Sequence, residues 1–435
     1  MKRLLLPIIA AALICGCGGI KEEPEKTDGA TEITVWHPWG GTDKEKFDKL
    51  VAYYNRSQNK IRVKAVFVPN DTSTSQKFFT SVASGKVPDL SVVDGPQVVS
   101  WAAQGAIVPI DKYMKEAGLT REDFFGPCYD EMLYRGKVHA LHFSADPNSL
   151  FGWNKKVFRE SGLDPERPPK TIKELDEMDR KIRRIDPKNG TISRMGIIPW
   201  LARANTVFLW GYAYGGSFYD PKTHKVTADD PKIVAFFEWM RDMARVYDPE
   251  KITAFASGFG GYDQSPFYIG KLAMTTIGPA TIEDIKRYAP NLDYGIAPWP
   301  APEDGEYGAA WLGGWCFGLP KGCKHPDEAW EFLRWMTADP EGTKVMFDIF
   351  HYMPAYKKSK AYDEMTPENP YWPFYRVLLT SKHTRPIMPA QALYMGEINK
   401  AIDRVIYGVQ SPKEAMEQVT SVVQKELDLK LAAEK

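Results

Sequence analysis

The chain has 435 residues, of which 43% are hydrophobic and 26% are charged, which is the composition of a globular protein. This length exceeds what one hydrophobic core usually supports and predicts two lobes or domains. The 56 basic and 56 acidic residues cancel and are spread along the chain. No net cationic field is left to hold nucleic acid, and no Lys/Arg block indicates a polybasic membrane patch.

The first residues have the layout of a secretory signal. "MKRLLLPIIAAALICGCGG" combines two cations with an apolar stretch too short to span a membrane, followed by small residues and cysteine. A transmembrane anchor is the alternative interpretation. We expect a signal peptide over residues 1–16 and export from the cytoplasm.

The sequence around Cys17 resembles the lipobox of bacterial lipoproteins, in which cleavage before the cysteine leaves that residue to carry a lipid. The resemblance implies lipidation of Cys17, with Cys15 as the alternative, and a flexible polar tether up to residue 30. The protein would then be anchored outside the cytoplasmic membrane, in a periplasm or on the outer face of a single-membrane cell.

Two of the three further cysteines could form a disulfide. Cys316 and Cys323 bracket a turn-like segment, so a disulfide and two free thiols are both compatible with the sequence, whereas Cys128 has no near neighbour. No cysteine or histidine spacing is typical of a zinc site. We therefore expect no metal and no other cofactor.

The body opens with alternating strands and helices. This βαβαβ rhythm predicts a mostly parallel sheet, with ligands bound beyond the carboxyl ends of its strands. The predicted strands cover 33–35, 60–68 ("KIRVKAVFV") and 88–94 ("PDLSVVD"), and the predicted helices cover 42–58 and 73–84.

The rest of the chain mixes both kinds of element and becomes helical toward its end. No internal repeat is found, so a solenoid is not expected. Strands are predicted over 137–143, 150–154, 271–278 and 293–300, and amphipathic helices over 171–185, 229–247, 326–338, 340–350, 396–408 and 411–428.

Six motifs follow one another in an order typical of one family. On these motifs the chain resembles the family 1 extracellular solute-binding proteins, the sugar-capturing components of bacterial ABC importers. The motifs are "ASGKVPDLSVVDG" (83–95), "GAIVPID" (105–111), "LFGWNKKVFRESGLDPERPPKTIKEL" (150–175), "FYIGKLAMTTIGPA" (267–280), "YGIAPWP" (294–300) and "GGWCFGLPKGCKHPDEAWEFLRWMT" (313–337).

The resemblance implies an α/β fold of the type II periplasmic-binding-protein kind, with two lobes that close on ligand by a hinge. It implies crossovers near 142–149, 298–313 and 350–355. It also implies a monomer that delivers its ligand to membrane permease subunits and catalyses no reaction. The first lobe would comprise 31–142 plus 299–350, and the second lobe 143–298 plus 351–430.

A sugar site needs aromatic faces for C–H patches and planar polar groups for hydroxyls. "EITVWHPWGG" ends the first strand with Trp36, His37 and Trp39, at the family's usual cleft position. Alternatively, an indole plugs the rim of the lobe and the histidine only binds its own loop. Asp94, Gly95 and Asp146 follow where the family has polar contacts. The alternatives there are a helix N-cap at Asp94 and an Asx-turn at Asp146.

"ARANTVFLWGYAYGGSFYD" corresponds to a family segment that presents aromatic rings in the second lobe. It supplies Trp210 and Tyr212 as candidates, with Arg203 and Asn205 as further polar ones. The alternative is a buried helical stripe that includes Trp210.

"AAWLGGWCFG" matches the segment that returns to the first lobe. Its glycines, Gly313 and Gly314, would let the backbone approach a ligand, between Trp311 and Trp315. The alternative is a strand bulge packed by tryptophans. Arg385 could bind hydroxyls or a carboxylate.

One position departs from the family pattern. Many members carry an aromatic residue where this chain has Ala280, so stacking would fall to a neighbour such as Trp210 or Tyr262.

The predicted function is capture of a carbohydrate, an oligosaccharide, for an ABC importer. One alternative is a receptor of the same fold for a non-sugar solute, which the fold alone does not exclude. The other is a secreted glycoside hydrolase, which needs two carboxyl groups facing each other across the sugar. The helical C-terminal half argues against the barrel that such an enzyme would use.

Overall fold

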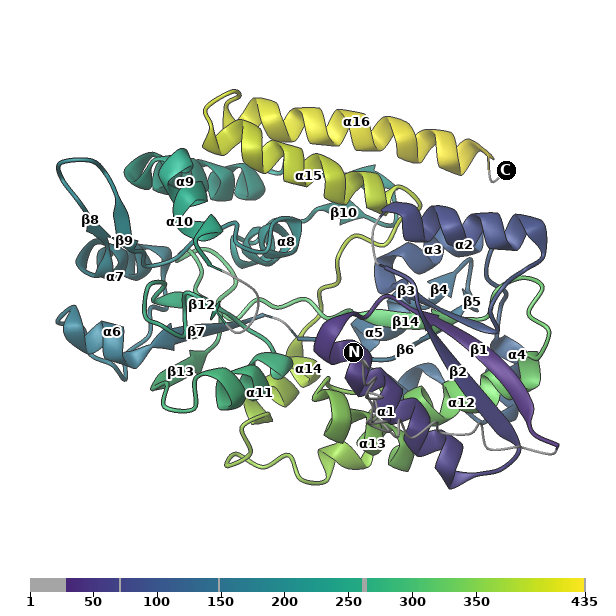
Figure 1. Cartoon of the computed structure of the whole chain (residues 1–435). Coiled ribbons are helices and arrows are strands. Elements are labelled where there is room, and N and C mark those ends of the chain that lie inside the picture. The colour runs from purple at the N-terminus through teal and green to yellow at the C-terminus, as the bar shows by residue number, and fades with distance from the viewer. Residues whose placement is uncertain (1–28, 70–71, 148, 260–263, 434–435) are drawn as a thin grey trace, which may run out of the picture.

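The computed structural model describes residues 29–69, 72–147, 149–259 and 264–433. Figure 1 shows two lobes, each built around its own sheet, at opposite ends of the molecule. The predicted signal peptide, the lipidation site at Cys17 and the aromatic candidate Tyr262 lie outside the described residues.

The first lobe is purple to blue in Figure 1, with green additions from later in the chain. It contains β1 (Thr31–His37), α1 (Gly41–Ser57), β2 (Ile61–Phe67), α2 (Thr72–Ser84), β3 (Leu90–Asp94), η1 (Gly95–Gln97), α3 (Val98–Ala103), α4 (Asp111–Glu116), η2 (Arg121–Asp123), α5 (Gly126–Glu131), β4 (Leu133–Tyr134), β5 (Lys137–Val138), β6 (Ala140–His142), β14 (Trp315–Gly318), α12 (Pro326–Ala338), α13 (Pro340–Phe350) and η4 (Lys360–Tyr362), and α14 (Trp372–Thr380) packs on its core.

The second lobe is formed mainly by the middle of the chain and by its last two helices. It contains β7 (Leu150–Asn154), α6 (Lys155–Glu160), α7 (Ile172–Ile182), β8 (Arg184–Ile185), β9 (Ile192–Arg194), α8 (Ala204–Ala213), β10 (Tyr219–Asp220), β11 (Lys225–Val226), α9 (Pro231–Tyr247), α10 (Pro249–Ser257), β12 (Met274–Ile277), α11 (Pro279–Tyr288), β13 (Tyr294–Ala297), α15 (Gln391–Ile406) and α16 (Pro412–Ala433).

The first lobe confirms the expected βαβαβ unit. Its described strands form a five-stranded sheet of order β2-β1-β3-β14-β6, in which β1 is parallel to both β2 and β3. Helix α1 covers this sheet with Phe47, Leu50, Val51 and Tyr54, the apolar face that its sequence predicts. The carboxyl ends of β1 and β3 therefore meet at one edge of the sheet.

The second sheet corrects the expectation that parallel pairing predominates. Its described strands have the order β12-β7-β13, and β7 is antiparallel to both neighbours. Strands β12 and β13 with α11 between them do form a βαβ unit, but β7, from 120 residues earlier in the chain, lies between the two strands. The local rhythm of strand and helix does not reveal such an insertion.

The chain crosses between the lobes where β6 ends at His142 and β7 begins at Leu150, and again between β13 and β14. Within the second crossover, Trp311 packs in the second lobe's core and Trp315 starts a strand of the first lobe. Helix α14 packs on the first lobe's core through Phe374 and Leu378. The chain crosses a third time between α14 and α15, later than the crossover expected near 350–355, because η4 and α14 still pack on the first lobe's core. The exact lobe boundaries stay a prediction.

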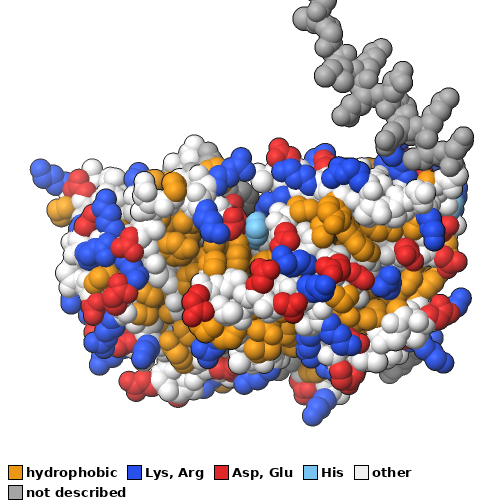
Figure 2. Space-filling view, turned by 90° about the horizontal axis from the view of Figure 1, so that it is seen from below, with side chains coloured by type: hydrophobic (Ala, Val, Ile, Leu, Met, Phe, Trp, Pro, Cys, Tyr) orange, Lys and Arg blue, Asp and Glu red, His pale blue; other side chains and the backbone are white. Residues whose placement is uncertain are grey.

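The described cysteines are unpaired, so Cys316 and Cys323 are free thiols in this structure. Positive and negative side chains alternate over the face seen in Figure 2, with hydrophobic side chains between them. Within the described residues, no helix combines the length and the apolar character needed to cross a membrane.

Candidate ligand-binding site between the lobes

A cavity of about 270 Å³ lies between the two lobes. The first lobe contributes the carboxyl ends of β1 and β3 together with parts of α2, η1 and α3. The second lobe contributes the first turn of α8, a residue of α15 and the segment between α14 and α15. The lining residues are Trp36, His37, Pro38, Val68, Phe78, Ser91, Val92, Val93, Asp94, Gln97, Trp101, Asn205, Trp315, Arg385 and Met395.

Aromatic rings form much of the first-lobe wall. Trp36 and Trp315 are partly exposed in the cavity, whereas Phe78 and Trp101 are buried and stack with their centroids 4.0 Å apart. The ammonium of Lys77 lies 5.2 Å from the centroid of the Trp36 ring, at the rim. Half-exposed indoles in a concave site offer flat apolar faces to the C–H patches of a ligand.

Several polar atoms at the cavity have no hydrogen-bond partner within the described residues. They are both ring nitrogens of His37, the side-chain oxygen of Asn205 and the Nε of Arg385. His37 is only 1% exposed, and burial lowers its pKa to about 4, so its ring is neutral at physiological pH. Because a buried polar group without a partner is costly, these atoms indicate a place where a polar ligand completes the hydrogen bonding.

Asp94 and Arg385 form an ion pair across the cavity. Two guanidinium nitrogens of Arg385 donate to the two carboxylate oxygens of Asp94, at 3.0 and 2.6 Å. The Arg385 side chain is 7% exposed and lies 4.9 Å from the centroid of the Trp311 ring. Although burial opposes the charged form, the carboxylates of Asp94 and Glu131 raise the pKa of Arg385.

The backbone that carries Arg385 is held by the second lobe. The Tyr212 hydroxyl donates to the Thr384 carbonyl at 2.6 Å, and the Tyr212 ring stacks on His383 with the centroids 4.3 Å apart. Leu312 donates its N–H to the His383 carbonyl at 2.9 Å. The ion pair therefore joins β3 of the first lobe to a segment anchored on α8 of the second.

A buried polar cluster lies next to this ion pair. His142 Nε2 is 3.0 Å from a carboxylate oxygen of Glu131, and His142 Nδ1 lies 2.9 Å from the Ser144 carbonyl. The Ser144 hydroxyl donates to Asp146 at 2.8 Å. Burial raises the pKa of Glu131 against the opposing effect of His142, and it raises that of Asp146 to about 7. Both carboxyl groups are thus more easily protonated than ordinary ones.

Two backbone segments pass close to the cluster because they lack side chains. A Cβ on Gly95 or Gly313 would meet the Glu131 carboxyl group, and one on Gly314 would meet Ser144 and Asp146. The Gly95 N–H donates to the Gly314 carbonyl at 2.8 Å. These glycines let the backbone pass close to the buried cluster. The sequence predicts instead that they let the backbone approach a ligand.

The structure brings five of the predicted site residues together at the cavity: Trp36, His37, Asp94, Trp315 and Arg385. The other eight predicted residues do not line it. Gly95, Gly313, Gly314 and Asp146 belong to the buried cluster, Tyr212 and Trp311 support Arg385, and Trp39 and Trp210 lie in the cores of the first and second lobe.

The burial of Trp39 and Trp210 has simple physical causes. Trp39 is 5% exposed and packs against Phe47, Phe143 and Phe350 under the cavity. Trp210 is 0% exposed, and its Nε1 donates to the Pro199 carbonyl at 3.1 Å. Its helix, α8, is buried on nearly all sides, so the alternative of a buried stripe describes it better.

Other residues at the site carried little sequence signal. Asn205 is in the first turn of an otherwise apolar helix and is only a further candidate from the sequence. Trp101, Gln97 and Met395 follow patterns that suit an ordinary amphipathic helix. Glu131 is 0% exposed, although glutamate is usually a surface residue. Among the described residues, no group of three or more His, Cys, Asp or Glu side chains could hold a metal ion.

Comparisons with known proteins show which family and which relatives the chain resembles. The model of the family "Bacterial extracellular solute-binding protein" matches residues 39–343. A maltotriose-binding protein of Pyrococcus abyssi is 26% identical over 414 residues, which cover 92% of this chain and 82% of that protein. An sn-glycerol-3-phosphate-binding periplasmic protein of Yersinia enterocolitica is 26% identical over 410 residues, 89% of each chain. The solved structure of CpMnBP1 with mannotriose bound is 28% identical, with a TM-score of 0.77 over 90% of this chain and 100% of that one.

Proposed function

Since this chain belongs to the bacterial extracellular solute-binding proteins, we propose that it is the receptor of an ABC importer and binds a carbohydrate in the cavity between its lobes. One observation carries the choice of ligand. Partly exposed indoles and unpartnered polar atoms line the same cavity, and a sugar has both C–H patches and hydroxyls to match them.

The relatives support a small oligosaccharide. One of them is named for maltotriose, and a similar solved structure holds mannotriose. In the proposed mode, Trp36 and Trp315 stack on the sugar ring, and His37, Asn205 and Arg385 bind hydroxyls. No bond of the ligand is made or broken.

Ligand binding would close the cleft. Residues from both lobes line the cavity, so a sugar that touches Trp36 and Asn205 together favours the closed arrangement over an open one. The hinge would lie in the crossovers after β6 and before β14. The closed form then presents the ligand to the permease subunits in the membrane.

The proposed location is outside the cytoplasmic membrane. Cleavage after residue 16 would leave Cys17 to carry a lipid, and the polar residues up to 30 would tether the folded body. Such an anchored monomer meets solutes before they enter the cell.

A ligand screen tests this proposal. The folded body, from residue 29 onward, is titrated with maltotriose, mannotriose and other oligosaccharides while intrinsic tryptophan fluorescence and thermal unfolding are followed. A ligand at a concentration of 100 times Kd should stabilise the protein by about 2.7 kcal/mol. A response only to peptides, polyamines or metal ions would overturn the carbohydrate proposal.

A further inference from the structure

The charges at the cavity are balanced. Among the described lining residues, the charged side chains are those of Asp94 and Arg385, and they neutralise each other. His37 adds no charge, because burial keeps its ring neutral. Unlike a site built around an unpaired arginine, this cavity holds no spare positive charge for an anionic ligand.

The geometry of the pair leaves Arg385 little room for a second anion. The bidentate contact with Asp94 occupies two of the guanidinium nitrogens, and the Trp311 ring covers one face. Only Nε lacks a partner. A ligand carboxylate or phosphate at this nitrogen would approach the Asp94 carboxylate and be repelled by it.

The unpartnered atoms also favour hydroxyls. Asn205 offers an oxygen that can only accept, and neutral His37 offers one donor and one acceptor. A hydroxyl both donates and accepts, so it can bind each of these atoms. A carboxylate or phosphate dianion only accepts, and would leave the Asn205 oxygen facing another acceptor without a proton between them.

The carboxyl groups behind the cavity add no positive charge that could attract an anionic ligand. Glu131 lies on the Arg385 side with an oxygen 3.0 Å from His142 Nε2, and Glu131 and Asp146, as carboxyl groups, can only contribute negative charge. Two further cations lie near these residues: Lys44, which acts on His37 and is paired with Asp48, and Lys77, which is exposed over the Trp36 ring. The Lys77 ammonium is hydrated there and attracts anions only weakly.

From these contacts we infer that the site selects uncharged sugars, and that Asp94 imposes this choice by neutralising Arg385. The inference rests on the proposed function and narrows it. Relatives of this chain include proteins named for a neutral trisaccharide and proteins named for a phosphate ester, and the balanced cavity favours the first kind of ligand.

Matched ligands test the inference on the unmodified protein. Calorimetry compares maltotriitol with maltotrionate, and mannotriitol with mannotrionate, since each pair differs only by a terminal hydroxymethyl group or carboxylate. The alditol should bind at least about tenfold more tightly than the acid. sn-Glycerol 3-phosphate should show no binding in the same concentration range.

The Asp94→Asn variant then tests the role of Asp94. It should raise the affinity for the aldonates relative to the alditols by about tenfold, because Arg385 becomes an unpaired cation. Asp348→Asn, which removes an exposed carboxylate from α13, should leave the ratio unchanged. Lys77→Gln should also leave the ratio unchanged. If Lys77→Gln changes the ratio and Asp94→Asn does not, Lys77 controls selectivity and the role given to Asp94 is wrong.

The outcomes separate the inference from the function on which it rests. Binding of the acids with affinity equal to or higher than that of the alditols would overturn the inference and leave a carbohydrate receptor. No binding of any saccharide would overturn both. Should Asp94→Asn not fold, the ligand pairs measured on the unmodified protein still decide whether the site rejects anions.

Discussion

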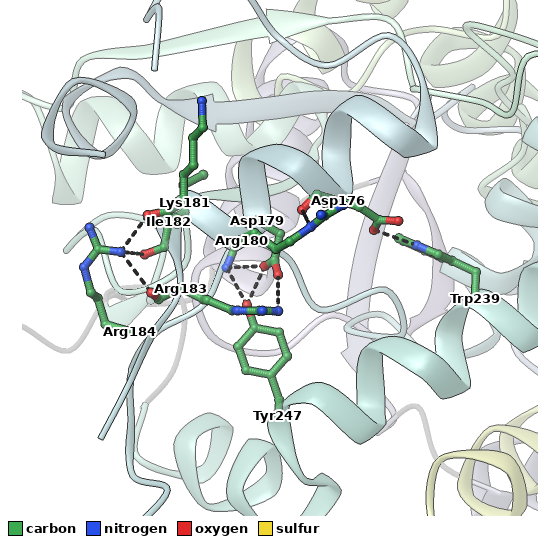
Figure 3. A network of polar contacts seen from close by, with 10 residues as sticks. Asp176, Asp179, Arg180, Lys181, Ile182, Arg183, Arg184, Trp239 and Tyr247 are labelled. Carbon is green, nitrogen blue, oxygen red and sulfur yellow. Dashed lines mark hydrogen bonds and ion pairs between the residues drawn. The ribbon is translucent and has the colours of Figure 1, made fainter. Parts of the chain in front are cut away.

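Two buried polar regions of this protein differ in how completely they are satisfied. In the second lobe, one oxygen of Asp179 accepts from the Tyr247 hydroxyl and from the Gly196 N–H, and the other lies 3.6 Å from Arg183 (Figure 3). Nearby, Trp239 donates to Asp176 at 2.9 Å. The protein itself provides the partners that this buried carboxylate needs.

The cavity between the lobes is different. Its buried atoms on His37, Asn205 and Arg385 have no partner within the described residues, although burial is just as costly there. A complete network contributes to stability, whereas the incomplete one at the cavity is where we propose that a ligand binds. Substitutions in the two regions should therefore affect different quantities, and the following predictions test that separation from the largest effect to the smallest.

Asp179→Ala should lower the free energy of unfolding by about 2–4 kcal/mol, because it leaves the buried Tyr247 hydroxyl without its acceptor and the Gly196 N–H with only a 3.4 Å contact to that hydroxyl. Denaturant unfolding measures this loss. Ligand affinity should not change. Asp242→Ala, at a carboxylate on α9 that is 61% exposed, serves as the control and should cost less than about 1 kcal/mol. A large loss of affinity in Asp179→Ala would contradict the separation.

Trp36→Ala should act on binding instead. Loss of a stacking face should weaken affinity by about 1–2 kcal/mol, roughly five- to thirtyfold, with little change in melting temperature. Titration calorimetry against the best ligand of the screen measures it. Tyr53→Ala removes a ring that stacks on Trp335 away from the cavity and should leave Kd unchanged. Equal effects of the two variants would remove Trp36 from the site.

Asn205→Ala should weaken binding by about 0.5–1 kcal/mol, two- to fivefold, through loss of one hydrogen bond to a hydroxyl. Its backbone carbonyl, which accepts from Trp311 Nε1 at 3.2 Å, is kept. Stability should stay the same, because the lost oxygen has no partner in the protein. A lower melting temperature with unchanged affinity would assign Asn205 a structural role.

Asp146→Asn should change the pH dependence of stability. Burial raises the pKa of Asp146 to about 7, so between about pH 4 and pH 7 the folded state holds a proton that the unfolded state has lost. The stability that Asp146 contributes is full below pH 4 and is lost as pH rises through 7. The unmodified protein should therefore lose stability relative to the Asp146→Asn variant between about pH 4 and pH 7, and thermal unfolding measures the difference. A constant difference would show that Asp146 does not titrate in this range.

Part of the site could be predicted because it depends on local order. β1 and β3 are parallel strands of one βαβαβ unit, so their carboxyl ends had to meet, and Trp36, His37 and Asp94 meet with them. Strand order does not predict which of two neighbouring side chains faces the cavity. It did not separate Trp36, which faces the cavity, from Trp39, which turns into the core.

Other parts depend on contacts between distant segments. Asp94 and Arg385 are 291 residues apart, and no periodicity in either segment indicates that they pair. The burial of Glu131 against Gly95 and Gly313 has no sequence signal either, since the two glycines were equally compatible with a ligand. Trp210 was ambiguous because a helix buried on all sides has no face that marks its surroundings.

By itself, the sequence determined many of the strands and helices, the two-lobed α/β class and the edge of the first sheet at which we propose that a ligand binds. Hydrophobic periodicity and strand order can be recognised from consecutive residues, because they are local properties of the chain. Only the tertiary structure decided the insertion of β7 between β12 and β13, the pairing of Asp94 with Arg385 and which polar atoms are left without partners. Those features depend on which distant surfaces pack together, and packing depends on the shape and charge of both partners at once.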